Sequence, residues 1–248
     1  YWNSDLRCNL CVSRGKEECD LFKGVRSVDP KDAHRFAQAR TGASVIIDAS
    51  KISSWPKQSA DNHTVDARLI FLYCHPCKYV ASVIRRDENS IDGAFSDWKN
   101  QNKKLLSFVK KSHFPAIAVS YEQLAQNPHR DFPVICNFLW GNGFEKEALI
   151  YWKYEHHGLG GTGANSMYLK NYERGLYVTN DDNWYNDLHD KPQQVDDRWK
   201  TELDETTQKQ ILSAKESKAF FSPEMHLKVY KSRMLLASFR NYFQRLFF

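Results

Sequence analysis

The stretch ARLIFLYCHPCKYVASVIRR, residues 67–86, decides the fold class of this chain. Its first seven residues form a short apolar run, which predicts a strand over 67–73 that is buried on both faces. From Lys78 to Arg86 the apolar residues recur at helical spacing, so we expect a helix there. A strand that leads directly into a helix is typical of α/β proteins, and this is the class that we predict.

The same alternation continues on both sides of residues 67–86. Compact apolar runs predict two further strands, at 43–48 and at 116–119. Helical spacing predicts further helices at 32–40, 94–109, 132–139, 145–156 and 205–217. Because strands that alternate with helices connect by right-handed crossovers, we expect a central parallel sheet with helices on its faces.

Length and composition narrow the class of protein. The 248 residues, of which 42% are hydrophobic, can build one large domain with a sizeable core, and this excludes global disorder. A net charge of +5 is too small to indicate nucleic acid as a partner, but it suits an anionic small molecule. No apolar run reaches the ~18 residues that a membrane span requires. We expect a reducing compartment, the cytoplasm, with the Golgi lumen as the alternative for a eukaryotic source.

We predict one α/β domain over 1–222 and an amphipathic helix over 223–248. Within the domain, residues 1–30 form an irregular segment that contains cysteines. The apolar residues of the C-terminal stretch share one helical face: Leu227, Tyr230, Met234, Leu235, Phe239, Tyr242, Phe243 and Leu246. Two interpretations stay open for residues 224–248, a core helix or homodimer face and a basic helix on an anionic membrane surface.

The six cysteines allow two kinds of chemistry. Cys8, Cys11 and Cys19 have the crowded spacing of a zinc site, but no fourth ligand accompanies them, so we predict thiols and no metal. Cys74 and Cys77 lie between the strand and the helix, where the helix dipole stabilises a thiolate. A thiol oxidoreductase that acts through this pair is therefore one functional hypothesis, and it requires a low pKa for Cys74.

Chemically active residues follow each predicted strand. The first strand ends in Asp48-Ala-Ser-Lys51, the second leads into His75 and then Ser82, and the third ends in Ser120-Tyr-Glu122. In open α/β sheets, ligands bind outside the carboxyl ends of the strands. The sequence therefore predicts a ligand site at this edge of the sheet.

The order of these segments resembles the 3′-phosphoadenosine 5′-phosphosulfate (PAPS)-dependent sulfotransferases, especially their bacterial and carbohydrate-type branch. The segments that match are Cys8-Asn-Leu-Cys11 with Glu17-Glu-Cys19, Asp48-Ala-Ser-Lys51, Cys74-His-Pro with Ser82, Tyr121-Glu-Gln-Leu with Asn127-Pro128, His156-His157 with Ala164-Asn165, and Asp196-Asp-Arg-Trp199. They are spread over residues 8–200, so the resemblance covers most of the chain.

The resemblance implies a P-loop-like three-layer fold with a central parallel sheet. It also implies transfer of a sulfuryl group from PAPS to a hydroxyl of a carbohydrate or small metabolite, with adenosine 3′,5′-bisphosphate as product and no metal. Lys51 would stabilise the developing charge, and Asp48 or His75 would approach the acceptor hydroxyl as a base. The residues expected to bind the nucleotide are Ser50, Ser82, Arg86 and Asn165, with Arg85 as a further candidate. Tyr121 and Glu122 are expected to be structural.

Two departures from the family pattern support an alternative function. No Gly/Pro-(Arg/Lys)-Ser-Gly-Thr phosphosulfate loop occurs in these residues, and we expect it, with its strand and helix, upstream of Tyr1. Cys74 occupies the place of the family arginine that binds the 3′-phosphate, so Arg85 or Arg86 would have to supply that charge. The alternative is a catalytically degenerate binding or scaffold module.

The main candidates could also have purely structural roles. Asp48 and Lys51 could form a loop ion pair beside a capping Ser50. Ser82 could be a small helix residue packed on the sheet, and Arg85 and Arg86 solvated surface charges.

Overall fold

The structure is a computed structural model of the 248-residue chain. It describes residues 23–24, 27–29, 32–48, 67–86, 89–112, 114–141, 144–153 and 194–230, with only the backbone for 151–153. The chain divides into two compact units, one made of Tyr1–Val65 with Glu147–Gln193 and the other of Asp66–Lys146 with Gln194–Phe248.

The described part of the first unit is mostly helical. Helix α1 (Ala33–Thr41) confirms the helix predicted at 32–40, and it ends at Gly42, whose φ of 65° is the left-handed conformation that glycine adopts readily. The segment η3 (Lys146–Lys153), which starts one residue before this unit, is a 3-10 helix with a break at Ile150. It covers most of the helix predicted at 145–156, of which residues 154–156 lie outside the described residues.

The strand predicted at 43–48 is wrong. The backbone of these residues is irregular, and the side chains of Val45 and Ile47 are 48% and 78% exposed. A run of β-branched residues forms a strand only where another strand offers backbone hydrogen bonds and a packed face. The structure places neither beside the described residues of this segment.

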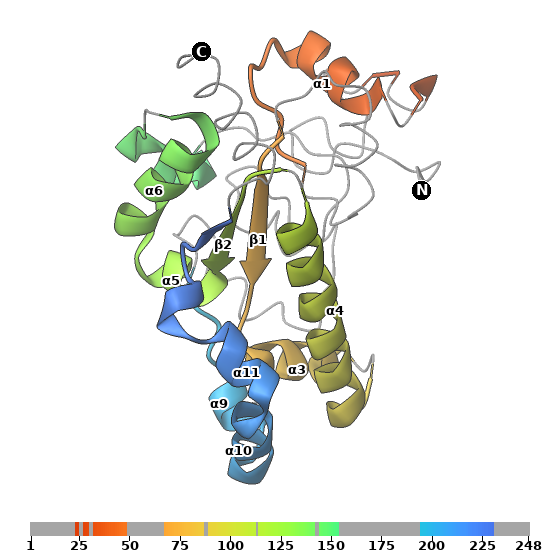
Figure 1. Cartoon of the computed structure of the whole chain (residues 1–248), viewed down its shortest axis with the longest axis vertical. Helices are drawn as coiled ribbons and strands as arrows, with labels where there is room; N and C mark the ends of the chain where they lie inside the picture. The colour runs from red at the N-terminus through yellow and green to blue at the C-terminus, as the bar shows by residue number, and fades with distance from the viewer. Residues whose placement is uncertain are drawn as a thin grey trace, which may run out of the picture. The chain divides into compact units, whose positions relative to one another are not determined.

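The second unit contains the sheet (Figure 1). Its first half runs through β1 (Leu69–Tyr73), α3 (Pro76–Arg85), α4 (Ile91–Lys111), β2 (Ala116–Ser120), α5 (Tyr121–Gln126) and α6 (Pro128–Trp140). Its second half runs through α9 (Trp199–Glu202), α10 (Glu205–Ser213), α11 (Lys215–Phe220), η4 (Pro223–Met225) and β3 (Val229–Tyr230). The strands predicted at 67–73 and 116–119 and the helices predicted at 78–86, 94–109 and 132–139 are confirmed, with ends shifted by a few residues.

The described sheet has three strands in the order β1-β2-β3. β1 and β2 are parallel, with Leu69 opposite Ala116 and Tyr73 opposite Ser120, whereas β3 is antiparallel to β2. The α/β class is therefore correct, but the sheet is mixed and small. The helix predicted from residue 223 is wrong at its beginning, because the backbone of Leu227 and Lys228 bonds to both sides of Ala118 on β2.

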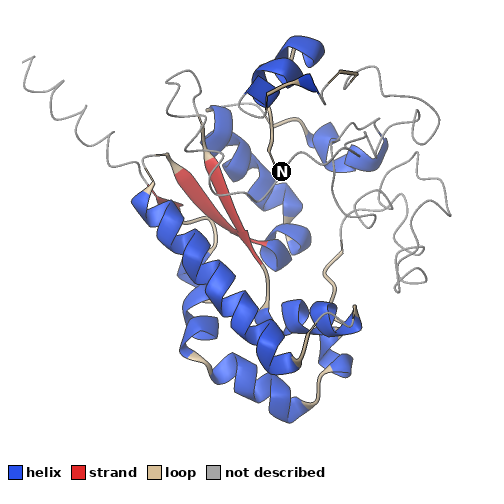
Figure 2. Cartoon of the chain, turned by 90° about the vertical axis from the view of Figure 1, so that its right-hand side faces the viewer, coloured by secondary structure: helices blue, strands red, loops and turns tan. Residues whose placement is uncertain are grey.

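Different helices cover the two faces of the sheet (Figure 2). On one face, Phe71 and Tyr73 of β1 pack against Trp98 of α4 and Phe220 of α11. On the other face, α6 covers Ile117 and Val119 of β2 through Ile135. Ile70 and Leu72 stay 43% and 54% exposed, so the expectation that the strand at 67–73 is buried on both faces is wrong. Every residue of β2 is buried.

None of the helices in the described ranges has both the length and the apolar composition needed to cross a bilayer.

Candidate functional site

A carboxylate joins the carboxyl ends of the two parallel strands. Glu122, in the first turn of α5, accepts a hydrogen bond from the backbone N–H of His75 at 2.8 Å. Its other oxygen accepts a hydrogen bond from the hydroxyl of Ser120 at 3.1 Å. Glu122 therefore holds the start of the segment after β1 against the end of β2, which is the structural role that the sequence predicts for it.

His75 lies in an aromatic environment at this edge. Its ring stacks on Trp199 of α9 at 4.4 Å between centroids, and the ring of Phe221 meets it edge-on at 4.8 Å. Nδ1 is buried and has no hydrogen-bond partner among the described residues. Burial lowers the pKa of His75 to about 4, and the charges of Lys200 and Lys78 act in the same direction. The imidazole is therefore neutral at pH 7 and has about the basicity of an ordinary carboxylate.

One face of α3 brings together two of the predicted nucleotide-binding residues. Pro76 begins the helix directly after β1, and Cys77, Val80 and Ala81 turn its apolar side into the core. Ser82 and Arg86 are four residues apart, so they share a face. There the hydroxyl of Ser82 accepts a hydrogen bond from Nη1 of Arg86 at 3.5 Å.

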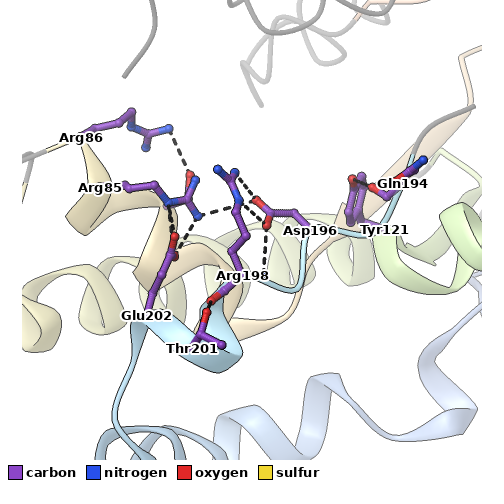
Figure 3. Close-up of polar contacts among 9 residues, drawn as sticks. Arg85, Arg86, Tyr121, Gln194, Asp196, Arg198, Thr201 and Glu202 are labelled. Carbon is purple, nitrogen blue, oxygen red and sulfur yellow. Dashed lines mark hydrogen bonds and ion pairs between the residues drawn. The ribbon is translucent and has the colours of Figure 1, made fainter. Parts of the chain in front are cut away.

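Arg85 lies in a network with the segment that leads into α9 (Figure 3). Its Nε lies 3.0 Å from Oε1 of Glu202, and its Nη2 lies 3.6 Å from Oδ2 of Asp196. Arg198 donates from Nε and Nη2 to the two oxygens of Asp196, at 2.9 and 2.8 Å. Burial acts to raise the pKa of Asp196, but the hydrogen bonds and charge of Arg198 and the charge of Arg85 together lower it. These ion pairs hold the segment 196–202 against α3.

Lys78 is a further cation on α3. Its ammonium nitrogen lies 3.2 Å from the centroid of the Tyr121 ring, and the hydroxyl of Tyr121 donates to the carbonyl of Gln194 at 2.8 Å. Burial lowers the pKa of Lys78, although the carboxylates of Glu122 and Asp196 act to raise it. Sequence reasoning missed Lys78 and Arg198. For Arg198, the available signal was the resemblance of Asp196-Asp-Arg-Trp199 to the closing segment of the sulfotransferases.

The other predicted site residues fall elsewhere. Asp48 belongs to the first unit, where its carboxylate lies 2.8 Å from Nε2 of His34. Lys51, Ser50 and Asn165 lie outside the described residues. Of the residues that the sequence predicts for the site, the structure places His75 at the N-terminal end of α3 and brings Ser82 and Arg86 together further along that helix.

Burial raises the pKa of the two thiols beside this site. Burial raises the pKa of Cys74 to about 12, although the charge of Lys78 acts to lower it. Burial also raises the pKa of Cys77 to about 11. Both are free thiols. A reactive cysteine needs a lowered pKa, so these thiols lack the property that the oxidoreductase hypothesis requires.

The contact between His226 and Asp131 has the form of a catalytic pair, with 2.9 Å between Nε2 and Oδ2. However, Nδ1 of His226 accepts the backbone N–H of Ser120 at 3.1 Å. Both ring nitrogens are therefore occupied, and the pair is structural.

No group of three or more His, Cys, Asp or Glu residues in the described ranges is arranged to hold a metal ion. Cys8, Cys11 and Cys19 lie outside those ranges.

No protein-family model matches this chain, and none of the curated proteins or solved structures compared with it is significantly similar.

Proposed function

We propose that this protein is a sulfotransferase that uses PAPS, and that Ser82 and Arg86 on α3 bind the 3′-phosphate of the nucleotide. The observation that supports this proposal is the hydroxyl of Ser82 beside the guanidinium of Arg86, 3.5 Å apart, on the helix that begins at the carboxyl end of β1. A guanidinium beside a hydroxyl matches the hydrogen-bonding needs of a phosphate.

The charge of α3 supports an anionic ligand. The helix and its C-terminal neighbour carry Lys78, Arg85 and Arg86, and no acidic residue. Asp196 and Glu202 form ion pairs with Arg85, Asp196 also pairs with Arg198, and Arg86 lies beside Ser82. An excess of positive charge on one helix face attracts phosphate and sulfate groups.

The proposal includes a P-loop-like sheet and a reaction in the cytoplasm. The parallel pair β1-β2, joined through α3 and α4, is a crossover connection of the kind found in that fold. PAPS supplies the activated sulfuryl group, and the acceptor is a hydroxyl of a carbohydrate or small metabolite. Lys51 as the stabilising cation, Asp48 or His75 as the proton acceptor, and Ser50 and Asn165 at the nucleotide are proposed from the resemblance alone.

A calorimetric titration with adenosine 3′,5′-bisphosphate tests the nucleotide site. We expect micromolar binding, weakened about tenfold in Ser82→Ala because a charge-assisted hydrogen bond is lost. Ser107→Ala is the matched control, because Ser107 is also a half-buried serine within a helix, α4. No heat at millimolar ligand, or equal affinity of Ser82→Ala and the wild type, would overturn the proposal.

The second candidate is a sulfotransferase-like binding or scaffold module without activity. It is favoured by Cys74, because the raised pKa of this thiol leaves it neutral where the family has an arginine. An activity assay distinguishes the two candidates. PAPS is incubated with the protein and a panel of sugar and small-alcohol acceptors, and chromatography measures the release of adenosine 3′,5′-bisphosphate. Binding without release in every case would favour the module.

A further inference from the structure

Lys78 is a half-buried cation without a neutralising partner among the described residues. Its ammonium contacts the ring face of Tyr121 and forms no hydrogen bond or ion pair within the described part of the chain. The carboxylates that act on it electrostatically are Glu122 and Asp196. Burial of the side chain makes its charge more costly, and the three donors of the ammonium stay available to an anionic ligand.

Both nearby carboxylates are already occupied by other donors. The oxygens of Glu122 accept the backbone N–H of His75 and the hydroxyl of Ser120. The oxygens of Asp196 are occupied by the guanidinium of Arg198. A shift of the Lys78 side chain toward either carboxylate would have to compete with these bonds. The structure therefore keeps the ammonium available at the carboxyl edge of β1.

Lys78 and the Ser82–Arg86 pair lie along one face of α3. Lys78 and Ser82 are four residues apart, which is about 6 Å along the helix axis, and Arg86 lies about 6 Å further. Two cationic positions separated in this way fit a ligand that carries two anionic groups better than a single phosphate ion. A nucleoside 3′,5′-bisphosphate carries its phosphates on two different carbons of the ribose.

We propose that Lys78 binds the 5′-phosphate of the nucleotide whose 3′-phosphate contacts Ser82 and Arg86. This inference rests on the proposed function of the Ser82–Arg86 pair and adds the cation for the other end of the ligand. Lys78 thereby supplies, from α3, positive charge at the end of the nucleotide where the sulfuryl group is carried.

The test compares three nucleotides by calorimetry on the full chain: adenosine 3′,5′-bisphosphate, adenosine 5′-monophosphate and adenosine 3′-monophosphate. Lys78→Met should weaken the binding of the bisphosphate and of the 5′-monophosphate roughly tenfold to hundredfold and leave the affinity for the 3′-monophosphate unchanged. Ser82→Ala should weaken the binding of the 3′-monophosphate and leave the affinity for the 5′-monophosphate unchanged. Lys99→Met is the matched control, because Lys99 also lies over an aromatic ring, that of Phe95 at 4.6 Å, but on α4.

Three results would overturn the inference. If the wild type binds the bisphosphate and Lys78→Met binds it equally well, the inference fails while the proposed function stands. An equal loss for all three nucleotides in Lys78→Met, with no recovery in Lys78→Arg, would show a structural role for this lysine. If the wild type binds none of the nucleotides, the proposed function and the inference fail together.

A second measurement on the wild type avoids any effect of substitution on folding. Acetylation by acetic anhydride, followed by mass spectrometry of each lysine, should modify Lys78 several-fold less in the presence of adenosine 3′,5′-bisphosphate. Lys99 is the internal reference and should be modified equally with and without nucleotide. Equal modification of Lys78 at saturating nucleotide would overturn the inference even if the substituted proteins were unstable.

Discussion

His75 contains a buried ring nitrogen that no described group satisfies, and this atom destabilises the fold. A buried polar atom without a hydrogen bond costs about 1–3 kcal/mol. The ring is retained because it packs between Trp199 and Phe221, and because its backbone N–H is bound by Glu122. The packing needs the shape of the ring, whereas the unpartnered nitrogen contributes nothing to it.

We expect His75 to make stability depend on pH. The pKa of His75 is about 4 in the folded chain and about 6.5 when unfolded, so the unfolded state binds more protons between these values. Stability therefore rises with pH across this window and is lost as the pH falls from 6.5 toward 4. Urea unfolding at pH 7 and pH 4.5 should show a loss of about 2 kcal/mol more in the wild type than in His75→Phe.

The exposed His129 provides the control for this experiment. His129→Gln should keep the pH dependence of the wild type, because His75 is unchanged. An identical pH dependence in His75→Phe and the wild type would show that the imidazole is not neutral and buried in the folded chain.

Sequence reasoning finds some residues of the site and misses others for a physical reason. Ser82 and Arg86 are adjacent because both lie on one helix, so their spacing predicts their contact. Asp196 and Arg198 meet Arg85 only because the chain returns to α3 more than a hundred residues later. No local pattern records such a contact.

At the scale of elements, a buried hydrogen bond between His226 and Asp131 connects the turn before β3 to α6. Asp131 is fully buried. Its Oδ1 lies 2.6 Å from Nε of Arg130, and its Oδ2 lies 2.9 Å from Nε2 of His226. His226 in turn accepts the N–H of Ser120 at the last residue of β2. The carboxylate thus fixes the strand end from which Glu122 reaches His75.

Asp131→Ala should destabilise the protein by about 1–3 kcal/mol, because it leaves Nε2 of the mostly buried His226 without its acceptor. Asp197→Ala is the control, since the Asp197–Lys200 pair is exposed at both side chains and such pairs contribute little. Chemical denaturation measures both variants. Equal effects of the two substitutions would contradict the structural role of the buried pair.

Helix ends also depend on contacts that periodicity does not report. The spacing of apolar residues predicts one helix at 205–217, but Ala214 is extended and separates α10 from α11. The buried hydroxyl of Ser217 donates to the carbonyl of Ile211 at 2.6 Å, which satisfies a carbonyl near the end of α10. Both segments are helical as predicted, but the structure has two helices where the sequence predicts one.

At the scale of the whole molecule, the second unit is built from two separate parts of the chain. Residues 66–146 supply β1 and β2, and residues from 194 onward supply the residues that close the core. Phe220 and Met225 belong to the cluster around Phe71, and Ile211 belongs to the cluster under α3. These two clusters are complete only when both parts of the chain are present.

This arrangement predicts that a chain cut between residues 154 and 193 stays assembled. After cleavage at an introduced protease site, the two fragments should elute together in size-exclusion chromatography and separate in guanidinium chloride. Ile211→Ala should weaken the association, because Ile211 is 2% exposed and large-to-small core substitutions cost about 2–5 kcal/mol. Separation of the fragments in buffer alone would contradict the discontinuous unit.

The sequence by itself determined the α/β class, the strands at β1 and β2, and the helices α1, α3, α4 and α6, because each depends on local apolar spacing. It also predicted that Ser82 and Arg86 lie one helical turn apart, and the structure brings them into contact. Only the tertiary structure decided that residues 43–48 form no strand, that Val229–Tyr230 pairs antiparallel to β2, and that His75 is half-buried and neutral, with Nδ1 buried. These outcomes depend on the hydrogen-bond partners and on the loss of water that packing creates between residues distant in the chain.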